Sequence, residues 1–205
     1  MTIRFHKNDL PDLSNYNVDA VAIDTETLGL NPHRDRLCVV QISPGDGTAD
    51  VIQIAQGQKS APNLVRLLGD GNITKLFHYG RFDLAVLYNA FGVMPEPVFC
   101  TKIASRLTRT YTDRHGLKDI CSELLGVSLS KVQQSSDWAA ETLTPEQIEY
   151  AASDVLYLHR LREVLVARLA RENRSAVADA CFRFLPARAR LDLMGWEETD
   201  IFAHS

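Results

Sequence analysis

The stretch "VDAVAIDTETLGL", residues 18–30, is an apolar run with two acids near its far end, Asp24 and Glu26. Side chains alternate across a β-strand, so these two carboxylates point to the same face, about 7 Å apart along the backbone. Charged groups are costly to bury unless they are paired or bind a metal. The pair therefore indicates a divalent-cation site at the strand end, although an Asp-x-Glu pair also arises by chance and is weak evidence alone.

Apolar segments that follow this stretch predict a sheet. "RLCVVQIS" and "TADVIQI" are separated by turn-rich "GLNPHRD" and "SPGDG", which predicts three consecutive antiparallel strands. "ITKLFH" predicts a fourth strand. Two helices are predicted around it: "SAPNLVRLLGDG", with Ser60 as the candidate N-cap and a glycine stop, and "RFDLAVLYNAFG".

The second half of the chain is helical in pattern. "TKIASRLTR" and "GLKDICSELLG" predict short helices. Thr144, Pro145 and Gln147 form a capping box with proline at the first helical position, and this helix is expected to run to about Asn173. "SAVADACFRFLPARARL" predicts one more helix, interrupted or capped around Pro186. Together these elements predict an α/β fold with a mixed sheet of about five strands, three antiparallel and then parallel, flanked by helices.

Composition limits the class of protein. The chain has 205 residues, 45% of them hydrophobic, which predicts a single domain over residues 1–205. Neither a signal peptide nor a membrane-length apolar run is visible, so we expect a cytoplasmic location and no membrane contact. Four cysteines without a C-x-x-C pair predict neither a disulfide nor a zinc site. A net charge of -4 argues against strong binding to long duplexes and favours a small or locally held nucleic acid.

Further acids lie in two later segments. Asp83, in "KLFHYGRFDLAVL", falls in the first turn of a predicted helix, where an acid is also favoured simply by the helix N-terminus. Tyr150 and Asp154, in "YAASDVLYL", are four residues apart and share a helix face. Because that face is also apolar, the two could equally be polar residues at the edge of the core.

The order and context of these motifs resemble the DEDD superfamily of 3′-to-5′ exonucleases, in its tyrosine-bearing branch. "DTETLGLNP" resembles the first family motif, "HYGRFDL" the second, and "SDWAAETLTPEQIEYAASDVLYL" the third, with the tryptophan and leucine typical of ribonuclease D relatives. The resemblance covers roughly residues 18–165 and implies a ribonuclease H-like fold. It departs from the ribonuclease D pattern at Glu141 and Thr142, where a basic residue and proline are usual, so a phosphate or RNA contact is in doubt.

The resemblance also implies the chemistry. Two divalent ions, Mg²⁺ or Mn²⁺, would be held by four acids, and a tyrosine would orient the attacking water. These five expected catalytic residues are Asp24, Glu26, Asp83, Asp154 and Tyr150.

The length and the tail of the chain bear on the substrate. The chain is too short for the helical nucleic-acid-binding domains of ribonuclease D, and "CFRFLPARARLDLMGWEETDIFAHS" resembles the short stand-alone relatives of the nano-RNase C type. That likeness implies hydrolysis of dinucleotides to 5′-mononucleotides by a ring-like homo-oligomer, which could contain eight chains. The alternatives are a general 3′-to-5′ exonuclease on longer RNA or single-stranded DNA, and a nucleic-acid-binding module without catalysis.

Substrate contacts are expected from five further residues: Thr27, Leu28, His78, Arg114 and Lys131. Leu28 could instead pack in the core, His78 could be structural, and the basic residues could form an ordinary solvated face. The C-terminal helix and tail, about residues 175–205, carry apolar side chains that are costly to expose. We therefore expect this segment to pack on its own domain or on a neighbouring subunit.

Overall fold

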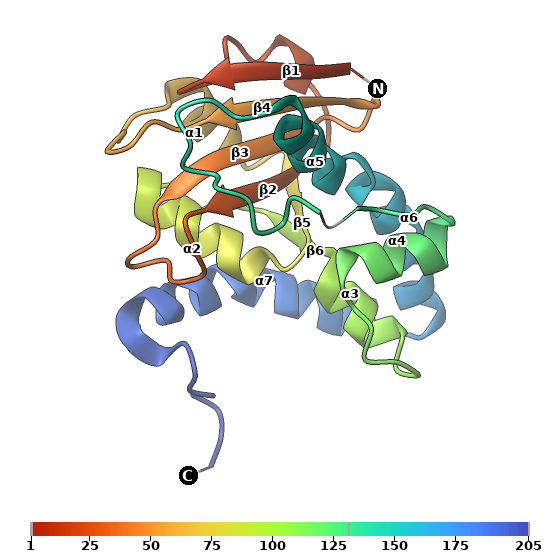
Figure 1. Cartoon of the computed structure of the whole chain (residues 1–205). Coiled ribbons are helices and arrows are strands. Elements are labelled where there is room, and N and C mark those ends of the chain that lie inside the picture. Colours follow the sequence, from red (N-terminus) through yellow and green to blue (C-terminus); the bar gives the residue numbers. More distant parts are fainter. Residues whose placement is uncertain (1, 131, 205) are drawn as a thin grey trace.

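The computed structural model describes residues 2–130 and 132–204 and contains a six-stranded mixed sheet in the order β1-β4-β3-β2-β5-β6 (Figure 1). The strands β2, β3 and β4 form an antiparallel meander, and β5 and β6 continue the sheet in parallel with β2. The strands are β1 (Thr2–Lys7), β2 (Ala20–Thr27), β3 (Leu37–Ser43), β4 (Thr48–Gln53), β5 (Thr74–Phe77) and β6 (Val98–Cys100).

The α/β class and the antiparallel-then-parallel order are confirmed, and the sheet has one strand more than expected. The segment of β1, "TIRFHK", mixes polar and apolar residues, and it pairs in parallel with β4 at the edge of the sheet. Its partly exposed side chains give little periodic signal, because an edge strand is buried on one side at most.

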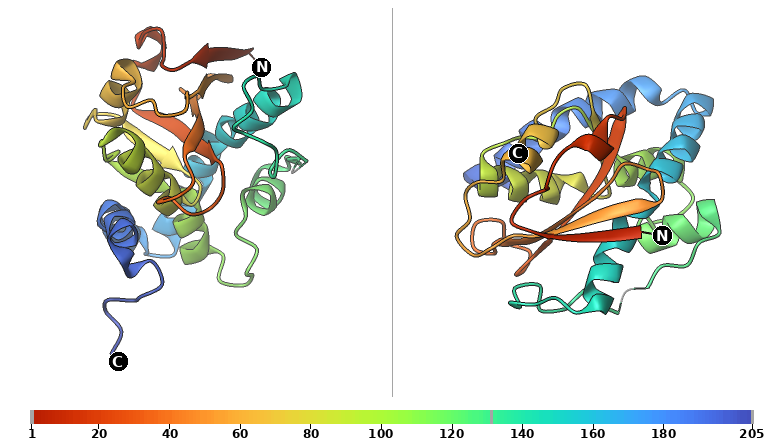
Figure 2. Two further views of the ribbon diagram at one scale, coloured as in Figure 1. Left: turned by 60° about the vertical axis from the view of Figure 1, so that its left-hand side comes forward. Right: turned by 90° about the horizontal axis from the view of Figure 1, so that it is seen from above.

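Helices cover both faces of the sheet. α1 and α2 lie on one face and α5 on the other, while α7 packs along α2 (Figure 2). β3 is buried at every position, which agrees with cover on both faces. The helices are η1 (Ser14–Tyr16), α1 (Pro62–Leu68), α2 (Gly80–Phe91), α3 (Thr101–Thr108), α4 (Leu117–Leu125), α5 (Pro145–Leu156), α6 (Leu158–Arg171), α7 (Ser175–Leu191) and η2 (Asp192–Trp196).

The helix boundaries confirm one cap and correct three expectations. The Thr144 capping box is present, with Thr144 Oγ1 accepting from the Gln147 backbone N–H at 3.2 Å. The helix that it starts was expected to run to about Asn173 but ends at Leu156. A second helix begins at Leu158, after a non-helical residue, Tyr157. α1 has Ala61 rather than Ser60 at its N-cap, and α7 continues through Pro186 without interruption.

The C-terminal segment is held to the domain by charged side chains. Asp192, 8% exposed, accepts hydrogen bonds from Arg81 at 2.6 and 2.7 Å and from Arg188 at 2.6 Å. Farther along, Phe202 packs on Phe184 of α7 with ring centroids 5.6 Å apart. These contacts join the tail to its own domain, and packing on a neighbouring subunit stays a prediction.

Several apolar side chains of this tail stay largely open to solvent: Met194, Trp196, Ile201 and Phe202. Among the described residues, no helix combines the length and the apolar character needed to cross a bilayer.

Candidate active site

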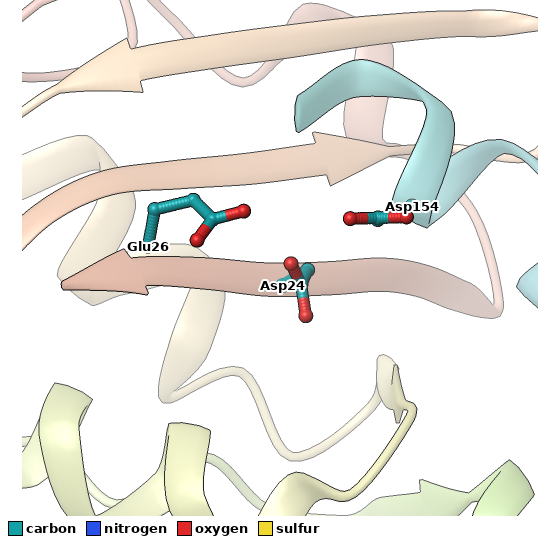
Figure 3. Close-up of side chains that lie close together, drawn as sticks. All are labelled: Asp24, Glu26 and Asp154. Carbon is teal, nitrogen blue, oxygen red and sulfur yellow. The ribbon is translucent and has the colours of Figure 1, made fainter. Parts of the chain in front are cut away.

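Three carboxylates converge on one face of the sheet. Asp24 and Glu26 project from the same face of β2, and Asp154 approaches from α5, so that one oxygen from each lies within 4.8 Å of the others (Figure 3). The alternation along β2 gives the first two their common direction. The approach of Asp154 depends on the packing of α5 over the sheet, which joins segments 128 residues apart in the chain.

Asp83 reaches the same pocket from the first turn of α2. The chain turns from β5 into α2 through Tyr79, which has a left-handed backbone (φ 69°), and Gly80 packs against Phe77 so closely that a Cβ would lie 2.8 Å from it. Asp83 Oδ1 accepts a hydrogen bond of 2.7 Å from Thr25 Oγ1 on β2. Asp83 lines the pocket with the other three acids but stands outside their tight group.

Burial and mutual repulsion make this pocket unfavourable for negative charge. Burial, followed by repulsion from the other acids, raises the pKa of Asp24 well above its usual range and that of Glu26 to about 9. Burial likewise raises the pKa of Asp83 and that of Asp154 to about 7. Within residues 2–130 and 132–204, no lysine or arginine forms an ion pair with any of the four.

Tyr150 borders the acids on α5. Its ring lies against Trp138, with centroids 6.0 Å apart, and Trp138 is 3% exposed. Burial and then the nearby acids, Asp154 foremost, raise the pKa of the Tyr150 hydroxyl above its ordinary value. The hydroxyl therefore keeps its proton near neutral pH and can donate or accept a hydrogen bond.

The pocket has a volume of about 320 Å³, and its lining includes two basic side chains. Lys102 and Lys118 line it, and Lys102 Nζ stands 4.3 Å from the centroid of the Tyr79 ring. Arg114 is exposed in the loop between α3 and α4 and is absent from the pocket lining, so its contact with substrate stays a prediction. Lys131 lies outside the described residues.

His78 lines the pocket, and one of its two ring nitrogens has a partner in the described chain. Its Nδ1 lies 2.9 Å from Thr101 Oγ1, and its Nε2 is buried without a hydrogen-bond partner. Burial, with the charge of Lys102 as the second cause, lowers the pKa of His78 to about 3, so the ring is neutral at working pH. The bond to Thr101 supports a structural role for His78, and its contact with a phosphate stays a prediction.

The loop after β2 places two leucines differently. Thr27 lines the acid pocket, and Leu28 lines a neighbouring depression with Ile54 and Gln58, so Leu28 is neither in the core nor among the acids. Leu30, 85% exposed, lines both the acid pocket and a second depression beside it. Gly29 allows this arrangement because a Cβ there would lie 2.4 Å from Asp35 Oδ2.

Leu30 was not expected from sequence. Two leucines separated by a glycine follow the acids. A loop lacks the regular side-chain alternation of a strand or helix, so the sequence does not indicate which leucine faces the pocket.

Comparison with known proteins places this arrangement in a family. A family model described as a 3′-5′ exonuclease matches residues 9–170. The chain belongs to this 3′-5′ exonuclease family. The hydrolytic enzyme class and the ribonuclease H-like fold expected from the sequence are thereby confirmed.

Within this exonuclease family the chain is of the ribonuclease D-like, NrnC type. It is similar to Brucella melitensis NrnC with bound Mg²⁺ (77% identity, TM-score 0.97) and to the same protein bound to pGG (78% identity, TM-score 0.98), each over 100% of both chains. It is 36% identical to "Ribonuclease D" of Gluconacetobacter diazotrophicus over 75% of this chain and 39% of that protein. The exonuclease thus spans about two fifths of the length of the curated relatives it matches.

Proposed function

We propose that this exonuclease is a two-metal-dependent 3′-to-5′ exoribonuclease that hydrolyses very short RNA, dinucleotides above all, to 5′-mononucleotides. The observation that carries the proposal is the convergence of four carboxylates, one buried and three half-buried, from β2, α2 and α5 without a cationic side chain paired to them in the described chain. The full-length similarity to a protein whose structure contains pGG supports the short substrate.

The donor set fits divalent cations. Carboxylate oxygens are the ligands that Mg²⁺ and Mn²⁺ prefer, and oxygens within 4.8 Å of one another can share an ion. The pKa values of Asp24 and Glu26 are raised, which means that negative charge is unfavourable in this pocket. The positive charge of a bound cation would offset it. Divalent cations bound here would lower the pKa of water and neutralise charge on the phosphate.

Each residue then has a role in this proposal. Asp24, Glu26 and Asp154 would together hold a cation, and Asp83, which lines the same pocket, would contribute a further carboxylate. The protonated Tyr150 hydroxyl would orient the attacking water rather than deprotonate it. Attack at the terminal phosphodiester forms a new P–O bond, breaks the bond to the 3′ oxygen, and releases a nucleoside 5′-monophosphate.

Leu30 and Lys102 are the substrate contacts that the structure favours. The exposed side chain of Leu30, between two depressions, offers an apolar surface for a nucleobase. Lys102 lines the same pocket as the acids, and its ammonium group would attract a phosphate. Thr27 lines the pocket beside the acids and stays a candidate.

A panel of labelled RNA and DNA, from dinucleotides to long oligonucleotides, tests the proposal with Mg²⁺, with Mn²⁺ and with a chelator. A steep preference for RNA dinucleotides that the chelator abolishes supports it. Efficient stepwise shortening of long RNA or single-stranded DNA would favour the general exonuclease instead. Chelator-insensitive or absent mononucleotide release would favour a module without catalysis.

A ring-like homo-oligomer remains part of the proposal. The solvent-exposed apolar side chains of the tail, including Met194 and Trp196, supply a surface that a neighbouring subunit could cover. Size-exclusion chromatography with light scattering measures the assembly, and a monomer at micromolar concentration would remove the ring from the proposal.

A further inference from the structure

Thr25 lies between the two acids of β2 and faces the other way. Because side chains alternate along a strand, Asp24 and Glu26 share the α5 face while Thr25 points to the face covered by α2. Its side chain is buried, with 7% exposure, and its hydroxyl donates to Asp83 Oδ1 at 2.7 Å. β2 therefore presents Asp24 and Glu26 on one face, and from its other face it holds Asp83 through the Thr25 hydroxyl.

We infer that Thr25 is a positioning residue, which holds the Asp83 carboxylate in place for cation binding. The inference rests on the proposed function, because it assigns Asp83 to a cation site. A hydroxyl has a single proton to donate, so the bond orients the carboxylate through Oδ1. Oδ2 receives no side-chain hydrogen bond from the described residues and is the oxygen left for a ligand.

Asp83 needs this support more than the other acids do. Asp24, Glu26 and Asp154 form a group with ligand oxygens within 4.8 Å, whereas Asp83 stands apart from it on the first turn of a helix. That turn follows Tyr79, which has a left-handed backbone and caps α2 without a side-chain hydrogen bond. Among the described residues, the Thr25 hydroxyl is the one side-chain donor that holds the Asp83 carboxylate.

A purely structural role for Thr25 would lead to a different result. If Thr25 only satisfied a buried carboxylate, its loss would lower stability and leave cation affinity unchanged. Thr25→Val removes the hydroxyl and keeps the β-branched shape that suits a strand, and Thr25→Ser keeps the hydroxyl and loses a methyl group. Thr108→Val is the matched control, because Thr108 is also buried (5% exposed) and donates to the Ala104 carbonyl at 2.8 Å, away from the acids.

The experiment measures Mn²⁺ binding by calorimetry, and Mg²⁺ dependence of dinucleotide hydrolysis, for the full-length protein. Thr25→Val should weaken cation binding about tenfold, the scale of a lost hydrogen bond to a charged group, and raise the Mg²⁺ concentration for half-maximal rate equally. The KM for dinucleotide at saturating Mg²⁺ should stay unchanged. Thr25→Ser should restore most of the affinity, and Thr108→Val should bind Mn²⁺ like the wild type.

A double-mutant cycle closes the test. In an Asp83→Asn background, Thr25→Val should cause no further loss of Mn²⁺ affinity, because its effect passes through the Asp83 carboxylate. Thr25→Ala serves the same purpose should the valine variant not fold. Wild-type Mn²⁺ affinity in Thr25→Val and Thr25→Ala would overturn the inference, whereas a wild type that neither binds Mn²⁺ nor depends on Mg²⁺ would overturn the proposed function instead.

Discussion

Two places in the same sheet bury carboxylates, and they treat negative charge in opposite ways. On β4, Asp50 is 2% exposed and is bonded by Arg4 at 2.8 and 2.7 Å and by His6 at 2.7 Å, with the Tyr16 hydroxyl donating as well. Burial alone would raise the pKa of Asp50, but these donors outweigh it and lower the pKa below the usual value. At Asp24 burial and repulsion act together and raise it.

The contrast separates a structural acid from a functional one. At Asp50 the chain itself provides the compensating charge. The Asp50 carboxylate on β4 thereby links β4 to side chains of β1 and η1. In the acid pocket the described chain provides no ion pair, and the compensating charge has to come from solution. A buried carboxylate therefore indicates a functional site only when the chain provides no cationic partner for it.

The largest expected effect is on activity. Asp24→Asn should lower dinucleotide hydrolysis by roughly 10³-fold or more, because the central ligand of the acid pocket is lost. Asp50→Asn should keep the rate per folded molecule near that of the wild type. Chromatography of released mononucleotides measures both. Comparable losses in the two variants would break the distinction.

Tyr150→Phe should come next, with turnover lowered by about 10²-fold and Mn²⁺ binding by calorimetry unchanged. The reason is that the hydroxyl orients the water and is not among the clustered metal-ligand candidates. Tyr88→Phe is the matched control, because the Tyr88 hydroxyl on α2 accepts a hydrogen bond from Arg190 of α7 and does not line the acid pocket. A near-normal rate for Tyr150→Phe would remove the assigned role.

The two leucines of the loop after β2 offer a smaller test. Leu30→Ala should raise the KM for a dinucleotide about tenfold, because part of a leucine's apolar contact with a base is lost. Leu28→Ala is the control, since Leu28 is also exposed and lines a different depression. Steady-state kinetics at saturating Mg²⁺ decides between them, and equal KM values would exclude Leu30 as a base contact.

Stability should change in opposite directions at the two sites. Asp50→Asn should lower the free energy of unfolding by about 2 kcal/mol, since Arg4 loses its charged partner but stays partly exposed. Asp24→Asn should raise the stability of the metal-free protein by about 1 kcal/mol, since one repelling carboxylate is removed. Urea unfolding with a chelator present measures both, and shifts of the same sign would contradict the comparison.

The smallest expected effect is the pH dependence of the Asp50 contribution. Its pKa is lowered in the folded state, so its stabilisation is present above the unfolded-state value and is lost as pH falls through the folded-state value. The difference in melting temperature between the wild type and Asp50→Asn should therefore be constant near neutral pH and shrink in acid. A difference that grows as pH falls would have the wrong sign.

Local rules account for what could be predicted from sequence. The capping box at Thr144, the meander and the common direction of Asp24 and Glu26 all follow from neighbours in the chain, and each is present. The family resemblance supplied the grouping of Asp83 and Asp154 with them. No short-range pattern states that helices so far apart in sequence meet at one strand.

What could not be predicted depends on packing between distant elements. His78 is enclosed because Thr101, at the start of α3, lies against it, and its sequence context says nothing about that. The break at Tyr157 falls within a continuous helical pattern. The bond from Thr25 to Asp83 spans 58 residues and joins a strand to a helix, so only the tertiary structure reveals it.

The two-sided use of β2 has a consequence for engineering the chain. A strand that slips by one residue exchanges its faces, so a single insertion before Asp24 would turn both acids toward α2 and leave a hydroxyl among the remaining ligands. The β2–β3 pairing already contains one irregularity, between Glu26 and Thr27, just beyond the last acid. An insertion beyond that irregularity should therefore leave the direction of both acids unchanged, whereas an insertion within the few residues before it should abolish the cation site.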